Sequence, residues 1–181
     1  MNRVVIIGSP GAGKSGVARS LSRKLHIRVF HLDRLFRYRN WRKKSLDVRE
    51  EILQNIVREQ QWIIDGNYFN TSELHLEKAD TIIFLGISPV KCLRQIMKRH
   101  WGGDSFVRRD IPEGSKDKVS LLLMFKVFYY PIGDQRMFEQ WLSNYIFKGG
   151  RKRVIWLCSK NEVEIFLAKQ EGLANSKKKS A

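Results

Sequence analysis

The fold of this chain is constrained most by residues 8–15, whose sequence GSPGAGKS matches G-x-x-x-x-G-K-[ST] at every fixed position. An apolar, β-branched run from Arg3 to Ile7 precedes the motif and predicts a buried parallel strand. From Ser15 onward the apolar residues take helical spacing. A strand, this loop and a helix form the context in which the motif binds phosphate. The sequence therefore predicts a phosphate-binding loop; the alternative is a glycine-rich turn with an incidental lysine.

The backbone and two side chains of this loop have predicted roles. Glycines let successive N–H groups face one anion, and the following helix adds the positive end of its dipole. We expect the catalytic ammonium of Lys14 to reach the β- and γ-phosphates of ATP, and the Ser15 hydroxyl to be a ligand of magnesium. The residues expected to bind the nucleotide phosphates are Gly8, Ser9, Pro10, Gly11, Ala12, Gly13, Lys14, Ser15 and Gly16.

Strands and helices alternate along the chain. Further short strands are expected at residues 28–32, 62–64, 81–87 and 154–157. Helices are expected over residues 46–60, from Ser88-Pro89, in two segments after residue 116, and after the capping box Ser159-x-x-Glu162. This order predicts a three-layer α/β fold, a five-stranded parallel sheet with helices on both faces. We expect one domain over residues 1–174 and a disordered basic tail over 175–181, because the tail is polar and lysine-rich.

Apolar spacing also predicts which helix faces turn toward the core. Val48, Ile52 and Ile56 are spaced four apart in the second expected helix, and Val90, Leu93 and Met97 are expected to point inward in the helix after Pro89. The helix from about Asp134 sets two apolar rows side by side: Met137, Trp141 and Tyr145 beside Phe138, Leu142 and Ile146.

Charge and cysteine content indicate which partners and which cellular compartment the protein is expected to have. The net charge of +16 attracts anions, which include nucleotides, nucleic acid and acidic membranes, without choosing among them. No apolar run approaches the ~20 residues of a membrane helix, and the phosphate-binding loop begins too early for a signal peptide. Cys92 and Cys158 have no metal-ligand spacing and are interpreted as buried, reduced thiols. We therefore expect a cytoplasmic protein that does not associate with membranes.

Two aspartates follow predicted strands, where the ligands of open parallel sheets bind. Asp65 ends the run Trp62-Ile63-Ile64, a pattern typical of a carboxylate that organises magnesium. Asp33 follows His31-Leu32 and could orient magnesium or accept a proton from an acceptor hydroxyl. The alternative is that each aspartate caps a helix or pairs with a surface arginine. His31 is interpreted as a packed histidine.

Phosphoryl transfer spreads negative charge, so several cations are expected around the transferred group. Lys98 and Arg99 end one helix, and Arg136 lies at the start of another. Arg108 and Arg109 lie in a glycine-rich insertion, residues 102–116, that could close over the nucleotide as a lid. The alternative is a solvated basic loop.

A second basic stretch runs from Arg34 to Lys44 and contains no acidic residue. Its cations are interleaved with Phe36, Tyr38 and Trp41. Arginines beside aromatic rings suit a nucleotide base and its phosphate, or single-stranded nucleic acid. The alternative is that the aromatic residues belong to the core and the cations are merely solvated.

The segments GSPGAGKS, HLDRLF, WIIDGNY, ADTIIFL, KRH and RRDIPEG together resemble the adenylate-kinase-like P-loop kinases. More narrowly, they resemble the bacterial DNA topology modulation (FlaR-type) proteins, over roughly residues 3 to 168. The loop occurs in many families, whereas HLD and DGNY after the second and third strands are more particular.

The resemblance implies a P-loop NTPase fold with a lid at about residues 102–116 and an acceptor-binding region at about 34–60. It implies that Gly11, Gly13, Lys14 and Ser15 bind the phosphates of ATP and Mg²⁺, with Asp33 and Asp65 on the metal and acceptor side. It also implies three phosphate clamps, Arg99, Arg109 and Arg136. Adenylate kinases continue Asp-Gly with Phe-Pro-Arg, whose arginine binds the acceptor phosphate, whereas Asn67-Tyr68-Phe69 follows here. The acceptor therefore stays unidentified.

These observations predict a kinase that moves the γ-phosphate of ATP to a small molecule or a nucleotide. The alternative is a DNA-associated NTPase or a nucleotide-regulated nucleic-acid-binding protein, which the net charge and the stretch from Arg34 to Lys44 favour. A third possibility is a nucleotide-binding protein that has lost turnover. Intact Lys14, Ser15, Asp33 and Asp65 speak against it.

Overall fold

The computed structural model describes residues 1–38, 42–68, 73–101, 121–148 and 150–179, and of residues 99, 100 and 171–179 it describes the backbone alone. Within these residues five parallel strands form one sheet in the order β2-β3-β1-β4-β5. The strands are β1 (Arg3–Gly8), β2 (Val29–His31), β3 (Trp62–Asp65), β4 (Thr81–Leu85) and β5 (Arg153–Leu157). The predicted five-stranded parallel sheet is confirmed.

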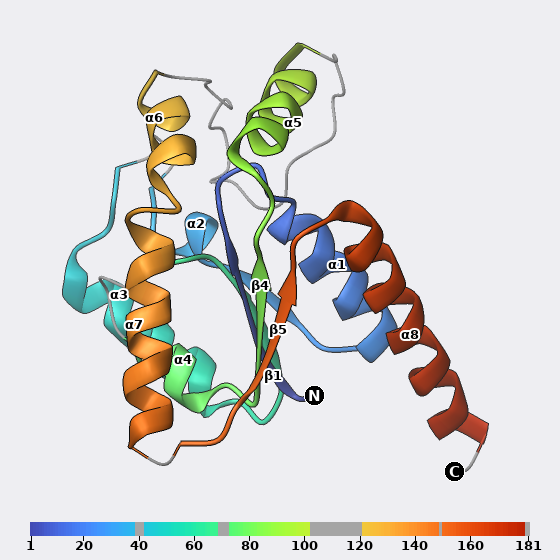
Figure 1. The fold of residues 1–181 in the computed structure, drawn as a ribbon. Coiled ribbons are helices and arrows are strands. Elements are labelled where there is room, and N and C mark those ends of the chain that lie inside the picture. The colour runs from blue at the N-terminus through green and yellow to red at the C-terminus, as the bar shows by residue number, and fades with distance from the viewer. Residues whose placement is uncertain (39–41, 69–72, 102–120, 149, 180–181) are drawn as a thin grey trace.

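Helices cover both faces of the sheet, and further helices lie beyond the carboxyl ends of its strands (Figure 1). α1 (Lys14–Leu25) and α8 (Lys160–Lys179) pack together on one face. The other face carries α3 (Leu46–Arg58), α4 (Leu74–Lys78) and α7 (Asp134–Phe147). Beyond the carboxyl ends of the strands lie the short α2 (Leu32–Leu35), α5 (Pro89–Trp101) and α6 (Leu121–Tyr129).

The central strand β1 shows why both faces need helices. It pairs with β3 on one side and with β4 on the other. Val5 and Ile7 point into the core under α3, α4 and α7, while Val4 and Ile6 point into the core under α1 and α8. All four are fully buried. A continuous apolar strand of this kind is typical of a parallel sheet that is covered on both faces.

The apolar rows of α3 and α5 reach the core only in part. In α3, Ile56 is buried and Ile52 packs partly buried against the core, whereas Val48 is 36% exposed. Leu53 and Val57 are buried as well. The reason is geometric: residues four apart drift by about 40° per step around a helix of 3.6 residues per turn. In α5 the buried residues are Cys92 and Ile96. The predicted row of Val90, Leu93 and Met97 lines a surface hollow with Arg94 and Lys98.

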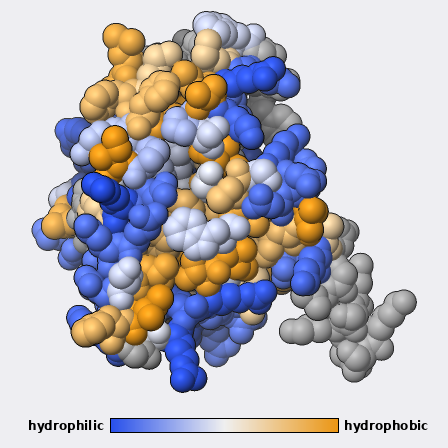
Figure 2. All heavy atoms as spheres, viewed as in Figure 1, coloured by the Kyte–Doolittle hydropathy of each residue, from blue (hydrophilic) through white to orange (hydrophobic). Residues whose placement is uncertain are grey.

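Apolar side chains of α6 and α7 remain at the surface (Figure 2). In α7 the buried pair is Phe138 and Trp141, whereas Met137 and Ile146 are exposed. The side-by-side apolar rows predicted for this helix therefore face the core only in part. No helix among the described residues is both long and apolar enough to cross a membrane.

The last helix begins as expected but extends further. Glu162 N donates to Ser159 Oγ over 3.2 Å, and the Glu162 carboxylate accepts from Cys158 N and Ser159 Oγ, so the capping box is confirmed. α8 then continues to Lys179, whereas a disordered tail was expected from Asn175. Adding a residue to an existing helix carries no nucleation cost, and lysine has good helix propensity.

The two cysteines have different environments. Cys92 is buried, as expected, and burial raises the pKa of its thiol. Cys158 is exposed, so the prediction of a buried thiol is wrong there. It follows β5, which is the last strand in the order of the sheet.

Candidate active site

The phosphate-binding loop is pressed closely against β4 and α5. Gly8 has φ +151°, and a Cβ there would lie 2.7 Å from the carbonyl oxygen of Leu85. Gly11 has φ +82°, and a Cβ there would lie 2.5 Å from the carbonyl oxygen of Cys92. Side chains at these positions would therefore displace backbone, which explains in physical terms the first fixed glycine of the motif, Gly8, and the additional glycine of this loop, Gly11.

Lys14 curls back over the loop. Its Nζ donates to the carbonyl oxygens of Gly8, at 2.9 Å, and Ser9, at 3.0 Å. α1 begins at Lys14 from Gly13, which provides no side-chain cap, and the first turn of the helix contains no acidic residue. The start of α1 therefore offers backbone N–H groups and a positive dipole end without a protein carboxylate on its own first turn.

Ser15 and Asp65 meet beside the loop. Ser15 Oγ donates to Asp65 Oδ2 over 2.7 Å, and Asp65 is 6% exposed. His31 Nδ1 lies 2.8 Å from the same oxygen. The structure thus brings together the two residues predicted to hold magnesium. It also gives His31, interpreted from sequence as a packed residue, a contact with the Asp65 carboxylate.

Asp33 lies just beyond the end of β2 rather than at its last residue. β2 ends at His31, and Asp33 belongs to the helical turn α2 rather than to the strand end. Its carboxylate is 53% exposed, and its Oδ1 accepts from Tyr68 Oη over 2.6 Å. Arg37 Nε lies 3.6 Å from the same oxygen. Burial, followed by the nearby Asp33 charge, raises the pKa of Tyr68, so its hydroxyl remains a donor at neutral pH.

Asn67 is a site residue that sequence reasoning missed. Gly8 N donates to Asn67 Oδ1 over 3.0 Å, and Asn67 Nδ2 donates to the Gly8 carbonyl over 2.9 Å. The available signal was the departure of this segment from Phe-Pro-Arg. Asp65, Asn67 and Tyr68 now have separate partners: the Ser15 hydroxyl, the first glycine of the loop, and Asp33. One short segment therefore connects the predicted magnesium, nucleotide and acceptor regions.

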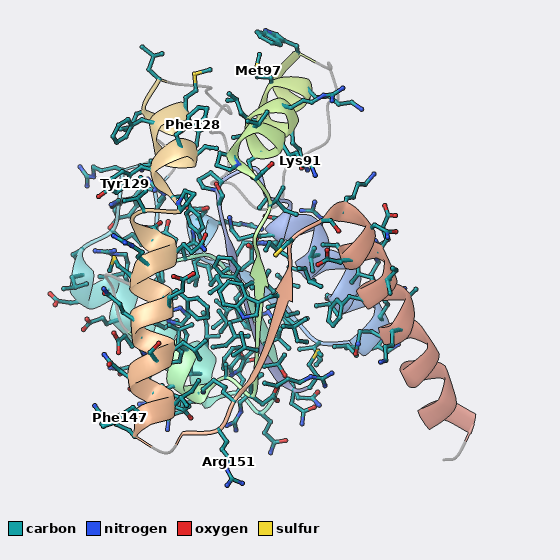
Figure 3. The ribbon with its side chains drawn as sticks, in the orientation of Figure 1. Lys91, Met97, Phe128, Tyr129, Phe147 and Arg151 are labelled. Carbon is teal, nitrogen blue, oxygen red and sulfur yellow. The ribbon has the colours of Figure 1, made fainter. Side chains whose placement is uncertain are left out.

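The predicted arginine clamps are not assembled by the described residues. Arg136 is exposed on α7. The side chain of Arg99 and the whole of Arg108, Arg109 and the predicted lid lie outside the described residues. In sequence that segment is preceded by α5, which carries Lys91 and Met97, and followed by α6, which carries Phe128 and Tyr129 (Figure 3). The role of these arginines therefore stays a prediction.

Asp134 is a second residue that sequence reasoning did not assign to the site. Burial raises the pKa of its carboxyl group, and the charges of Lys126 and Lys14 oppose that rise. Asp134 is the first residue of α7, while Lys126 lies on α6. A half-buried carboxyl group and a second lysine therefore lie within electrostatic range of the loop and its lysine.

The basic stretch from Arg34 to Lys44 divides between core and surface. Phe36 is fully buried and packs edge-on against Tyr68, with ring centroids 4.8 Å apart. Tyr38 is 46% exposed, and the charged groups of Arg42 and Lys44 lie 5.3 and 5.7 Å from the centre of its ring. Phe36 thus fits the core alternative and Tyr38 the exposed one, while Trp41 lies outside the described residues.

Comparison with known proteins gives one relative by sequence. No family description matches the chain. A protein of Methanosarcina barkeri (strain Fusaro / DSM 804) described as "Putative adenylate kinase" is 28% identical over an alignment of 121 residues, and the match covers 63% of this chain. The chain spans 66% of that protein's length, slightly less than two thirds.

Two solved structures share the fold. Deoxyadenosine kinase from M. mycoides with bound dATP matches with a TM-score of 0.52 and 16% identity, over 92% of this chain and 97% of its own. Shikimate kinase from Bacteroides thetaiotaomicron matches with a TM-score of 0.55 and 12% identity, over 96% and 98%. At such identities the likeness shows the fold alone: this chain has the α/β fold of P-loop kinases.

The comparisons support the resemblance to adenylate-kinase-like kinases but not the resemblance to FlaR-type proteins. The M. barkeri relative and the two structures agree with an adenylate-kinase-like or nucleoside-kinase-like fold. None of the three is described as acting on DNA. The resemblance to FlaR-type proteins, and the DNA-associated alternative with it, therefore gains no support from them.

Proposed function

We propose that this chain is a kinase that transfers the γ-phosphate of ATP to a hydroxyl group of a small acceptor. The proposal is carried by the Ser15–Asp65 pair, which lies beside a phosphate-binding loop with Lys14 curled over it. Asp33, which accepts a hydrogen bond from Tyr68, supplies a carboxylate that can take the proton of the acceptor hydroxyl. The kinase fold and the M. barkeri relative support the same reaction class.

Lys14 is expected to exchange partners when nucleotide binds. Its two bonds to loop carbonyls keep the ammonium at the loop, within half-buried surroundings. Phosphate oxygens carry more negative charge than carbonyl oxygens, so the ammonium gains stronger, charge-assisted bonds by moving to them. The loop amides and the start of α1 bind the same phosphates.

The donor atoms at this site fit magnesium. Ser15 Oγ and Asp65 Oδ2 are hard oxygen ligands 2.7 Å apart. Among the described residues no group of three or more His, Cys, Asp or Glu side chains could hold a metal. Magnesium does not need such a group, because it keeps several waters and takes one or two carboxylates together with phosphates. When bound, it would neutralise charge on the phosphates of ATP, while His31 keeps the Asp65 carboxylate in place.

The transfer step assigns a proton to Asp33. The acceptor oxygen forms a bond to the γ-phosphorus as the bond to the β,γ-bridging oxygen breaks, and ADP leaves with that electron pair. The hydroxyl proton goes to Asp33 Oδ2, on which the described residues place no hydrogen bond. Tyr68 holds Oδ1, so the free oxygen has a defined orientation.

The test uses ATP labelled at the γ-phosphate with a panel of nucleosides, nucleotides, sugars and small alcohols. We expect label to appear on an acceptor, and Asp33→Asn to lower this transfer about 10²- to 10⁴-fold, the range of general-base catalysis. Calorimetric binding of a non-hydrolysable Mg·ATP analogue should be unchanged by Asp33→Asn. If the wild-type protein releases only free phosphate with every acceptor, the proposal is refuted.

A further inference from the structure

Helix α6 is apolar on two opposite sides. On one side Val127 is fully buried and Leu123 is partly buried, and both pack in the core that includes Ala12 of the phosphate-binding loop. The other side presents large apolar side chains that are between 52% and 85% exposed, and Figure 2 shows hydrophobic side chains gathered over this helix. We name this set the α6 stripe; it consists of Leu121, Leu122, Phe125, Phe128 and Tyr129. A helix that is apolar all round is normally buried on every side, so the stripe is a candidate interface.

The spacing of the α6 stripe is the same in both directions along the chain. Each residue of an α-helix advances by about 100° around the axis, so the five positions fall within about 120°, with Phe125 at the centre. Leu121 and Tyr129 are four positions before and after Phe125. Leu122 and Phe128 are three positions before and after it. When two copies of such a helix pack antiparallel around a two-fold axis, Phe125 of one copy meets Phe125 of the other, and each flanking residue meets its counterpart.

The α6 stripe offers little to a charged partner. Residues 121–132 contain one charged residue, Lys126, which lies about 100° from Phe125 and hence at the edge of the stripe. A helix that attaches to an anionic membrane carries several lysines or arginines on a polar face. α6 has no such face, because Val127 and Leu123 pack into the core on its other side. Depletion of charge is typical of the core of homodimer interfaces, so the stripe fits a second copy of this chain better than a membrane surface.

The exposed area of the α6 stripe is sufficient for a small dimer interface. Taking about 150–200 Å² for each whole side chain, the five side chains expose roughly 500–600 Å². Two such stripes would bury roughly 1,000–1,200 Å², which meets the total of about 1,000 Å² that a specific interface needs. The rings of Phe125 and Tyr129 already stack, with centroids 5.8 Å apart and an interplanar angle of 11°. Because these side chains are held in place before association, pairing costs less side-chain entropy.

We propose that the α6 stripe is a homodimer interface, in which two copies of the chain pair their α6 helices antiparallel about a two-fold axis at Phe125. The proposal is independent of the kinase function. Repulsion between two chains of net charge +16 opposes the pairing. Salt screens this repulsion, since the Debye length falls from about 10 Å at 0.1 M to about 3 Å at 1 M. Salt therefore strengthens the dimer, whereas it would weaken attachment to an anionic membrane or an acidic protein.

The first test measures the mass of the full chain by sedimentation equilibrium at both salt concentrations, with protein from about 1 to about 100 µM. We expect the mass to rise with concentration from 21.3 kDa toward twice that value, and to rise further at high salt. Phe125→Asp and Phe125→Lys should each weaken association about 100-fold or more, because a charge is then buried against an identical charge.

The matched control is Phe147→Asp. Phe147 is an exposed phenylalanine at the end of α7, and Figure 3 shows it far from Phe128 and Tyr129. We expect the control to dimerise like the wild type. Thermal melts of the variants should match that of the wild type, because the Phe125 side chain is exposed. Leu122→Asp, at a second exposed position of the stripe, should give the same loss of dimer and checks that the loss does not depend on one variant.

The second test examines the two-fold axis. Phe125→Asp and Phe125→Lys proteins are mixed in equal amounts and sedimented together. We expect the mixture to recover the dimer mass, because the carboxylate of one copy then meets the ammonium of the other on the axis. A mixture that stays monomeric would overturn the proposed arrangement.

Three other results would overturn the proposal. One is a wild-type mass of 21.3 kDa at every protein and salt concentration. Another is a dimer that persists unchanged in Phe125→Asp and Leu122→Asp. The third is flotation of monomeric wild-type protein with vesicles of phosphatidylserine and phosphatidylcholine that is lost in Phe125→Asp, because the stripe would then be a membrane-binding surface.

Discussion

Replacing Asn67 with alanine removes two hydrogen bonds that hold the first glycine of the phosphate-binding loop. The Gly8 amide donates to Asn67 Oδ1, and the Gly8 carbonyl accepts from Asn67 Nδ2. In the nucleotide-free protein the same carbonyl also accepts from Lys14 Nζ over 2.9 Å. In the variant the Gly8 carbonyl keeps its hydrogen bond from Lys14 Nζ. The Gly8 amide loses its hydrogen bond to Asn67 Oδ1.

The cost should divide between folding and nucleotide binding. Loss of one net hydrogen bond, that of the Gly8 amide, lowers the free energy of unfolding by about 1 kcal/mol. This corresponds to a fall in Tm of about 2–4 °C for a chain of this size. When Lys14 moves to the phosphates, the Gly8 carbonyl loses its remaining partner. The nucleotide-bound state then loses about 1 kcal/mol more than the free protein does, so nucleotide affinity falls roughly fivefold.

The assay combines a thermal melt with calorimetric titration of a non-hydrolysable Mg·ATP analogue. Asn55→Ala is the matched control, since Asn55 is an exposed asparagine of α3, away from the loop. We expect the control to keep wild-type affinity. If Asn67→Ala lowers Tm but binds the analogue as tightly as wild type does, the argument that Lys14 leaves the Gly8 carbonyl is refuted.

Four further substitutions probe the remaining site residues. Lys14→Ala should abolish ATP-dependent turnover, measured with labelled ATP, while the thermal melt remains that of a folded protein. Asp65→Asn should raise the magnesium concentration needed for half-maximal turnover more than it weakens nucleotide affinity, because it removes a charged metal ligand. Tyr68→Phe should lower kcat with little change in nucleotide affinity, because Asp33 loses the donor that orients it. Asp134→Asn should flatten the pH dependence of stability. The raised pKa of Asp134 means that its contribution is complete below pH 3.8 and declines as pH rises through the raised value, so the variant should gain stability relative to wild type from pH 3 to 7.

Each of these expectations has an opposing result. Undiminished turnover in folded Lys14→Ala would contradict the role of the loop lysine. Equal loss of magnesium response and nucleotide affinity in Asp65→Asn would count against a metal role. A Tyr68→Phe protein with wild-type kcat would show that Asp33 needs no such orientation. Parallel stability curves for Asp134→Asn and wild type, recorded by chemical unfolding at several pH values, would exclude the proposed titration.

The phosphate-binding loop and the layered sheet were predictable because local sequence determines them. The apolar run before Gly8 and the spacing of Gly13, Lys14 and Ser15 define a strand, a turn and a helix start within a few residues of one another. Asp65 directly follows a buried strand segment, and strands in parallel present their carboxyl ends at one edge. The Ser15–Asp65 contact follows from those two facts together.

Sequence reasoning failed where a small change in backbone path redirects a side chain. Asp33 was expected at a strand end, but the chain turns into α2 at Leu32, and the Asp33 carboxylate accepts a hydrogen bond from Tyr68. Val90 was expected to point inward, but α5 leaves it 70% exposed. In each case the local pattern allowed two orientations, and packing against neighbouring elements selected one.

By itself, then, the sequence determined the loop, the sheet and the residues available at its carboxyl edge. The tertiary structure decided which of them meet. The strand order β2-β3-β1 places β3 beside β1, so Asn67, after β3, reaches Gly8 at the end of β1 across 59 positions of sequence. Spacing along a chain cannot specify such contacts, because they depend on which elements become neighbours when the apolar faces of the sheet are buried.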